Sequence, residues 1–156
     1  MTKEIKQQFT LRITQANSTQ LVVIIYEMLL CYMDEAKSAI ASEDKAETLE
    51  AIRKARGCIN ELMNSLHMEY EPAPSLMQLY LFCIRRLAAL EYSLEPSIIE
   101  EVKKVIVPLH EAYDKIADQN KQAPIMNNSQ SVYAGLTYGR GDLNENLSDQ
   151  NRGMRV

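Results

Sequence analysis

The chain has few of the residues that interrupt helices or build loop-based sites. Its 156 residues include only five glycines and five prolines, whereas hydrophobic residues make up 46% of the sequence. It contains no glycine-rich phosphate-binding loop and no G-x-S-x-G nucleophile motif. Leu, Ile, Met and Ala dominate the first three quarters, which favours helices. The composition therefore favours an all-α protein and gives no support to phosphate-loop or serine-hydrolase chemistry.

An excess of basic charge is also missing. The formal net charge is -4, with 17 Lys and Arg against 21 Asp and Glu. Such a chain has no positive field to neutralise phosphates, so we expect no nucleic-acid partner. The longest apolar run, Leu21 to Met33, is interrupted by Glu27 and is too short to span a bilayer. The N-terminal residues lack the apolar stretch of a secretory signal, so we expect a cytoplasmic protein without stable membrane insertion.

The cysteines do not have the spacing of a metal or redox site. Cys31, Cys58 and Cys83 are an odd number at wide spacing, with no C-x-x-C pair. We expect them to be buried, reduced side chains.

The histidines also lack the partners that catalytic or metal sites need. Asn64 stands three residues before His67, and Val107 three before His110, so the Glu-x-x-His motif of di-iron bundles is absent. We predict no catalytic residue, metal or cofactor. One rival hypothesis makes His110 a phosphate acceptor, although its neighbours lack the Lys-Gly context expected there.

Apolar residues recur three and four positions apart in four long segments, which predicts four helices. The first runs from Asn17 to about Ala41, and Asn17 with Gln20 predicts a capping box at its start. The second begins at Asp44 and ends before Pro72. The third runs from residues 74 or 75 to about residue 90, and the fourth extends from residue 96 through residue 116.

Pro108 lies inside the fourth helical pattern. A proline in a helix interior removes one hydrogen bond and usually bends the helix. We therefore predict a bend near Val107.

Three regions follow from these patterns. Residues 1–16 form a short N-terminal helix or cap with an apolar stripe of Ile5, Phe9 and Ile13. Residues 17–120 form an antiparallel four-helix bundle, because the connections between the helices are short. Residues 121–156 are rich in Asn, Gln, Ser and Gly and are expected to form a flexible or loosely docked tail.

Three stretches of the bundle resemble the flagellin export chaperone family, FliS. Gln15 to Leu21, continuing through Ile25-Tyr26-Glu27, is similar to the family's Thr-Ala-Ser-Pro-x-Glu-Leu start and the run after it. Residues 59–66 are similar to its Ile-x-Glu-Leu-x-x-Thr-Leu element. Leu79-Tyr80 and residues 84–87 are similar to its Leu-Tyr and Arg-Arg-Leu elements.

The chain also departs from the family pattern. Ser18 replaces the usual proline, Glu27 the usual aspartate, and Tyr113 stands where many relatives carry tryptophan. The family's N-terminal tyrosine has no clean match, and Phe9 is the nearest candidate.

The resemblance implies a chaperone that binds the disordered C-terminal segment of flagellin, blocks premature polymerisation and presents the client to the export gate. The first long helix is apolar on almost all sides, so its outer face needs a cover or a partner. We expect residues 1–15 to cover it and to move away when the client arrives, by the helix-in-groove mode of recognition. The alternative is a permanently packed N-terminal helix.

The residues expected to contribute to client binding or to the shape of the groove are Ile5, Phe9, Ile13, Leu21, Ile24, Tyr26, Leu62, Leu66, Tyr80 and Arg86. Each of them is alternatively an ordinary core or surface residue. A second hypothesis makes Val132, Tyr133, Leu136 and Tyr138 a mimic of the client, with plain disorder as its alternative. A rival of a different class is a structural four-helix module that forms a homodimer and has no flagellin client.

Overall fold

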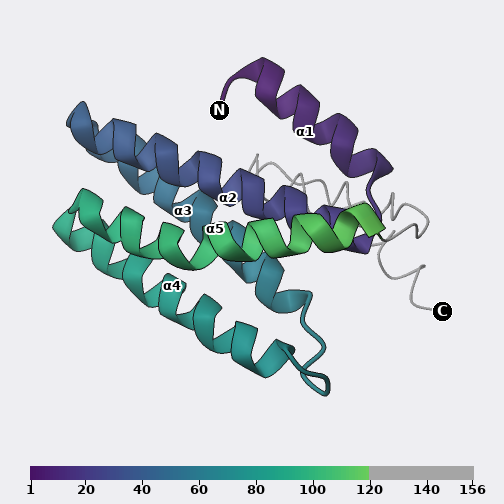
Figure 1. Cartoon of the computed structure of the whole chain (residues 1–156). Helices are drawn as coiled ribbons and strands as arrows, with labels where there is room; N and C mark the ends of the chain where they lie inside the picture. The colour runs from purple at the N-terminus through teal and green to yellow at the C-terminus, as the bar shows by residue number, and fades with distance from the viewer. Residues whose placement is uncertain (120–156) are drawn as a thin grey trace, which may run out of the picture.

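The computed structural model describes residues 1–119, and the regular elements in that range are all helices. They are α1 (Lys3–Gln15), α2 (Ser18–Ala41), α3 (Lys45–Asn64), α4 (Ala73–Ser93) and α5 (Pro96–Gln119). Helices α2 to α5 form a bundle in which each helix runs antiparallel to the next, and α1 lies outside it along α2 (Figure 1). The predicted fold class, an antiparallel four-helix bundle with a short N-terminal helix, is confirmed. The tail expected over residues 121–156 lies outside the described residues.

Helix α2 begins with the predicted capping box. The Asn17 side chain accepts a hydrogen bond from the Gln20 amide at 2.9 Å, and the Gln20 side chain accepts one from the Asn17 amide at 3.0 Å. Two amides at the start of the helix are thereby satisfied without water, and Asn17 is itself buried. The cap fixes the point at which the chain turns from α1 into the bundle.

Helix α2 packs mainly against α3 on one side and α5 on the other, while α4 closes the bundle opposite it. Its buried residues are distributed around the helix, as expected for an element that is apolar on almost all sides; they include Val23, Ile24, Ile25, Tyr26, Met28, Leu29, Tyr32 and Met33. Since the bundle cannot enclose every face of α2, one face is left for α1.

Tight turns join α2 to α3 and α4 to α5. Glu43 and Leu94 both have left-handed backbones, with φ of 57° and 53°. After α2, the Glu43 amide donates to the Ile40 carbonyl and the Asp44 amide to the Ala39 carbonyl, which is the Schellman pattern. These turns bring each helix back alongside the one before it.

The connection between α3 and α4 is longer. Residues 65–72 pass from one helix to the next through turns, and Glu71-Pro72 has a cis peptide bond. Met68 and Tyr70 are exposed there. Helix α3 ends before Pro72, as predicted, and this connection forms part of the site described below.

Helix α5 continues as one helix through Pro108, which is exposed. The bend expected near Val107 stays a prediction. Among the described helices, none is both long enough and apolar enough to cross a membrane.

The core contains two of the three cysteines. Cys58 and Cys83 are buried and Cys31 is partly buried, and all three are free. Burial raises the pKa of the Cys83 thiol to about 11 and also raises the pKa of Cys58 and Cys31. The thiols therefore stay protonated at neutral pH and behave as small apolar side chains.

Candidate functional site

Helix α1 covers one face of α2 through a few apolar residues. Phe9, Ile13 and Ala16 are buried, with exposed fractions of 6%, 1% and 2%. Ile5 belongs to the same predicted stripe but is 38% exposed. The apolar contact is thus concentrated in the second half of α1, close to the turn into α2.

One ion-pair cluster joins α1 to the bundle beside these residues. Arg12 of α1 donates a hydrogen bond to Glu27 of α2, and Nε2 of His110 on α5 lies 3.3 Å from the other Glu27 carboxylate oxygen. Arg12 also lies over the Phe9 ring, 5.8 Å from its centroid. Glu27 therefore links three helices at a partly exposed position, where an ion pair typically contributes less than about 1 kcal/mol.

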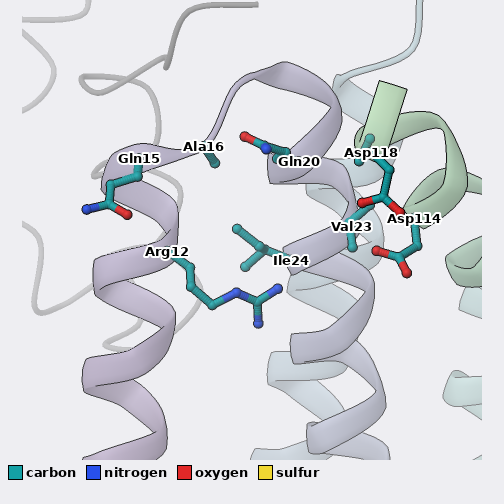
Figure 2. Close-up of a pocket in the computed structure, with 9 residues that line it drawn as sticks. Arg12, Gln15, Ala16, Gln20, Val23, Ile24, Asp114 and Asp118 are labelled. Carbon is teal, nitrogen blue, oxygen red and sulfur yellow. The ribbon is translucent and has the colours of Figure 1, made fainter. Parts of the chain in front are cut away.

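A cleft of about 320 Å³ lies between the end of α1, the start of α2 and the end of α5. Arg12 and Ile24 project into it from α1 and α2, and Asp114 and Asp118 approach from α5 (Figure 2). We call it the α1 cleft; its other lining residues are Gln15, Ala16, Gln20, Val23 and Ala117. Its walls combine buried apolar side chains with charged groups at the edge, so the cover over α2 is incomplete at this end.

A second cavity of about 380 Å³ lies at the same end of the bundle, between the start of α2, the α3–α4 connection and the later part of α5. We call it the tyrosine pocket. Most of its lining is apolar or aromatic, namely Val22, Leu66, Tyr70, Pro72, Ala73, Leu76, Tyr80 and Tyr113, and its polar lining residues are Ser18, Thr19, Ser65, His67 and Glu71. The pocket offers an apolar side chain of a partner a place to enter the bundle.

Three tyrosines from α2, α4 and α5 meet beside this pocket, and two of them, Tyr80 and Tyr113, line it. The hydroxyls of Tyr26 and Tyr80 form a hydrogen bond in the core, and the Tyr26 ring lies 5.7 Å from the Tyr113 ring, centroid to centroid. Burial raises the pKa of Tyr80 to about 12 and raises the pKa of Tyr26 and Tyr113 as well. The phenols therefore remain neutral hydrogen-bonding groups over the whole physiological pH range.

The structure brings several of the predicted site residues to these two cavities. Ile24 lines the α1 cleft, and Leu66 and Tyr80 line the tyrosine pocket. Tyr26 lies behind Tyr80 and is fully buried. Leu21 is partly buried at the first turn of α2 and packs against the core.

Two predicted residues lie elsewhere. Leu62 is fully buried in the core and lines neither cavity. Nε of Arg86 donates to Glu101 at 2.7 Å, which places it at the contact of α4 with α5. Their part in client binding remains a prediction, and in the structure both stabilise the packing of helices.

Sequence reasoning missed other lining residues. Val22, Leu76 and Tyr113 line the tyrosine pocket, and Asp114 and Asp118 line the α1 cleft. The only available signal was that Tyr113 occupies a position where an aromatic residue is expected. Spacing along one helix does not reveal which residues of other helices lie opposite.

The two cavities offer apolar surface to a binding partner. Among residues 1–119, no group of three or more His, Cys, Asp or Glu side chains is arranged to bind a metal. His110, the rival phosphate acceptor, is partly buried and lies against Glu27. Both cavities contain apolar side chains. In addition, α1 covers an apolar face of α2.

Comparison with protein families gives one result. The family model described as flagellar protein FliS matches residues 1–120, so the match includes all five described helices and both cavities. No curated protein matches the chain.

Proposed function

Because the chain belongs to the FliS family, whose general role is that of a flagellar export chaperone, we propose that it binds the C-terminal segment of flagellin in the cytoplasm. Binding prevents premature polymerisation and keeps flagellin ready for delivery to the cytoplasmic domain of the export gate. The observation that carries this proposal is the small apolar contact by which α1 covers one face of α2.

The apolar contact of α1 is small for a permanent element of the bundle. A helix of 13 residues is marginally stable by itself in water, so α1 depends on its docking. Phe9 and Ile13 are its large buried side chains, and burial of each contributes about 1.5–3 kcal/mol. A few kcal/mol therefore separate the covered state from the open one.

A client segment can replace this contact if it buries more apolar surface than α1 does. Displacement of α1 uncovers the α2 face that includes Ile24 and joins it to the α1 cleft. A disordered segment that folds on binding spends about 2–5 kcal/mol on its own ordering. Apolar contact along an extended groove offsets this cost, and competition with α1 keeps the complex reversible for export.

Isothermal titration calorimetry against the last forty or so residues of the organism's own flagellin tests the competition. Ile13→Ala removes most of a buried side chain and weakens the docking of α1 by about 2–5 kcal/mol. We therefore expect the affinity for flagellin to rise by about tenfold or more. Leu11→Ala is the matched control, because Leu11 lies on the same helix and is 60% exposed. The Leu11→Ala variant should bind the flagellin peptide with the same affinity as the unmodified chain.

Other outcomes identify the alternatives. An unchanged affinity for Ile13→Ala means that α1 is permanently packed, and a weaker affinity means that Ile13 contacts the client directly. Amide exchange gives a second test, since residues 3–15 should lose protection when the peptide binds. Light scattering with and without the peptide separates this proposal from the dimerising module, which would self-associate with concentration and ignore the peptide.

A further inference from the structure

The tyrosine pocket is an apolar cavity that α1 does not cover. Helix α1 contributes none of its lining residues, which come from α2, the α3–α4 connection, α4 and α5. Leu66, Leu76 and Tyr113 form apolar walls, and Tyr70 at the α3–α4 connection is 72% exposed. A cavity of about 380 Å³ accepts several side chains, so the bundle leaves apolar surface here that a further segment can bury.

The chain itself continues from the neighbourhood of this pocket. Tyr113 on the pocket wall lies six residues before the end of α5, a distance of about 9 Å along a helix. Another 37 residues follow, from 120 to 156. An extended chain covers about 3.3 Å per residue, so residues 120–125 alone reach about 20 Å, which exceeds the distance back to Tyr113.

The sequence beyond α5 contains apolar and aromatic side chains that match the lining of this pocket. Between residues 125 and 138 it combines apolar and aromatic side chains with amides and hydroxyls; the apolar members are Ile125, Met126, Val132, Tyr133, Leu136 and Tyr138. A segment tethered this closely has an effective concentration in the millimolar range, so a weak contact is sufficient.

We propose that residues 125–138 of this chain occupy the tyrosine pocket intramolecularly, with apolar side chains against Leu66, Leu76 and Tyr113. The tail thereby acts as an internal ligand that an external apolar segment must replace. The contact itself does not depend on the flagellin proposal, because it requires no client.

Site-specific photo-crosslinking in the full chain tests the contact. A benzophenone amino acid replaces Tyr70 at the pocket, and a second variant carries it at Tyr92, which is 92% exposed near the end of α4 and outside the pocket lining. Peptide mapping should show crosslinks from position 70 to residues 125–138 at a yield several-fold above that from position 92. Equal yields from the two positions would overturn the proposal.

Mixing isotopically labelled and unlabelled chains shows which chain is captured. Crosslinks within one chain support the proposal, whereas crosslinks between chains overturn it and make a second copy the occupant. Serine substitutions at Val132, Tyr133, Leu136 and Tyr138 should lower the yield from position 70 several-fold. Serine substitutions at Leu143 and Leu147, outside the proposed segment, are the matched control and should not change it.

Addition of the flagellin peptide to the crosslinking experiment links this contact to the proposed function. If the flagellin peptide binds and its apolar residues use the pocket, its addition lowers the intrachain crosslink from position 70. If calorimetry shows no flagellin binding, the crosslink in the chain alone still tests the tail contact. The two proposals therefore fail independently.

Discussion

The three tyrosines at the end of the bundle combine apolar packing with a buried hydrogen bond. Tyr26 and Tyr80 are almost fully buried, so a hydroxyl that loses its partner there cannot turn to water. An unsatisfied buried hydroxyl costs about 1–3 kcal/mol, whereas removal of both hydroxyls of a pair is much less costly than the sum of the two single losses. Replacement of either tyrosine alone is therefore expected to destabilise the protein more than the loss of one small hydroxyl group would suggest.

A double-mutant cycle measures this coupling. Tyr26→Phe and Tyr80→Phe should each lower the free energy of unfolding by about 1–2 kcal/mol, and the double variant should lose about 1 kcal/mol less than their sum. Urea unfolding followed by circular dichroism gives the three values. Tyr92→Phe, at an exposed tyrosine on α4, should stay within about 0.5 kcal/mol of the unmodified chain. Additive single losses would contradict a mutual hydrogen bond.

Glu61 is an acidic residue whose environment disfavours its charge. It is partly buried on α3, and burial raises the pKa of its carboxyl. An acid with a folded pKa above its unfolded value binds its proton more tightly in the folded state. Its stabilising contribution is therefore present at low pH and is lost as the pH rises through the folded pKa.

Glu61→Gln should remove this dependence on pH. The variant and the unmodified chain should have similar stability near pH 4, and the variant should become the more stable one as the pH rises toward 7. Thermal unfolding at several pH values measures the difference. Glu69→Gln, in the exposed α3–α4 connection, controls for the loss of one negative charge from a chain of net charge -4. A difference that is constant from pH 4 to pH 7 would contradict the assignment.

At the scale of elements, the joint between α1 and α2 is the feature with the clearest local cause. Asn17 is 2% exposed and makes both hydrogen bonds of the capping box, so it starts α2 and directs the chain away from α1. Its neighbour Ala16 is buried in the same joint. Loss of the cap is expected to loosen the start of α2 and the end of α1 together.

Asn17→Ala should lower the free energy of unfolding by about 1–2 kcal/mol. Amide exchange should show the largest loss of protection in the first turn of α2 and in the last turn of α1. Asn17→Ser keeps a neutral side-chain acceptor and should retain more of the stability, because serine caps helices about as well as asparagine. Equal losses for Ala and Ser would mean that interactions of Asn17 other than the cap are what matters.

The beginnings of helices were predictable because their signals are local. The Asn17–Gln20 box and the start near Asp44 depend on residues within one turn, and the structure has both caps. The tyrosine pocket was not predictable in the same way. Tyr26 and Tyr80 are 54 positions apart, and their meeting depends on how α2 and α4 are aligned along the bundle axis.

The apolar stripe of α1 shows the same limit. Ile5, Phe9 and Ile13 are equally spaced, so the pattern assigns them to one face without ranking them. The structure buries Phe9 and Ile13 and leaves Ile5 more than one third exposed. The difference comes from the course of α1 across α2, which the sequence of α1 does not contain.

At the scale of the whole molecule, residues 1–119 comprise a four-helix bundle and a helix attached to it. Helices α2 to α5 share one core, in which Leu29, Ile52, Leu87 and Val102 are fully or almost fully buried. Global unfolding of such domains requires about 5–15 kcal/mol. In contrast, α1 can open by losing only its own contacts with α2, which are the buried side chains of Phe9, Ile13 and Ala16 and the ion pairs of Arg12 with Glu27 and of the Met1 amino group with Glu35. Chaperone function by displacement of α1 requires this separation of energies.

Native-state amide exchange on the unliganded chain tests the separation. Amides of α2 should exchange only through global unfolding, and amides of α1 through an opening that costs a few kcal/mol. Ile13→Ala should speed exchange in α1 and leave α2 to α5 nearly unchanged. Ile59→Ala, the same substitution at a fully buried position of α3, should lower protection throughout the bundle by about 2–5 kcal/mol. If Ile13→Ala lowers protection equally in all five helices, α1 unfolds with the bundle, and a client would have to unfold the chaperone in order to displace it.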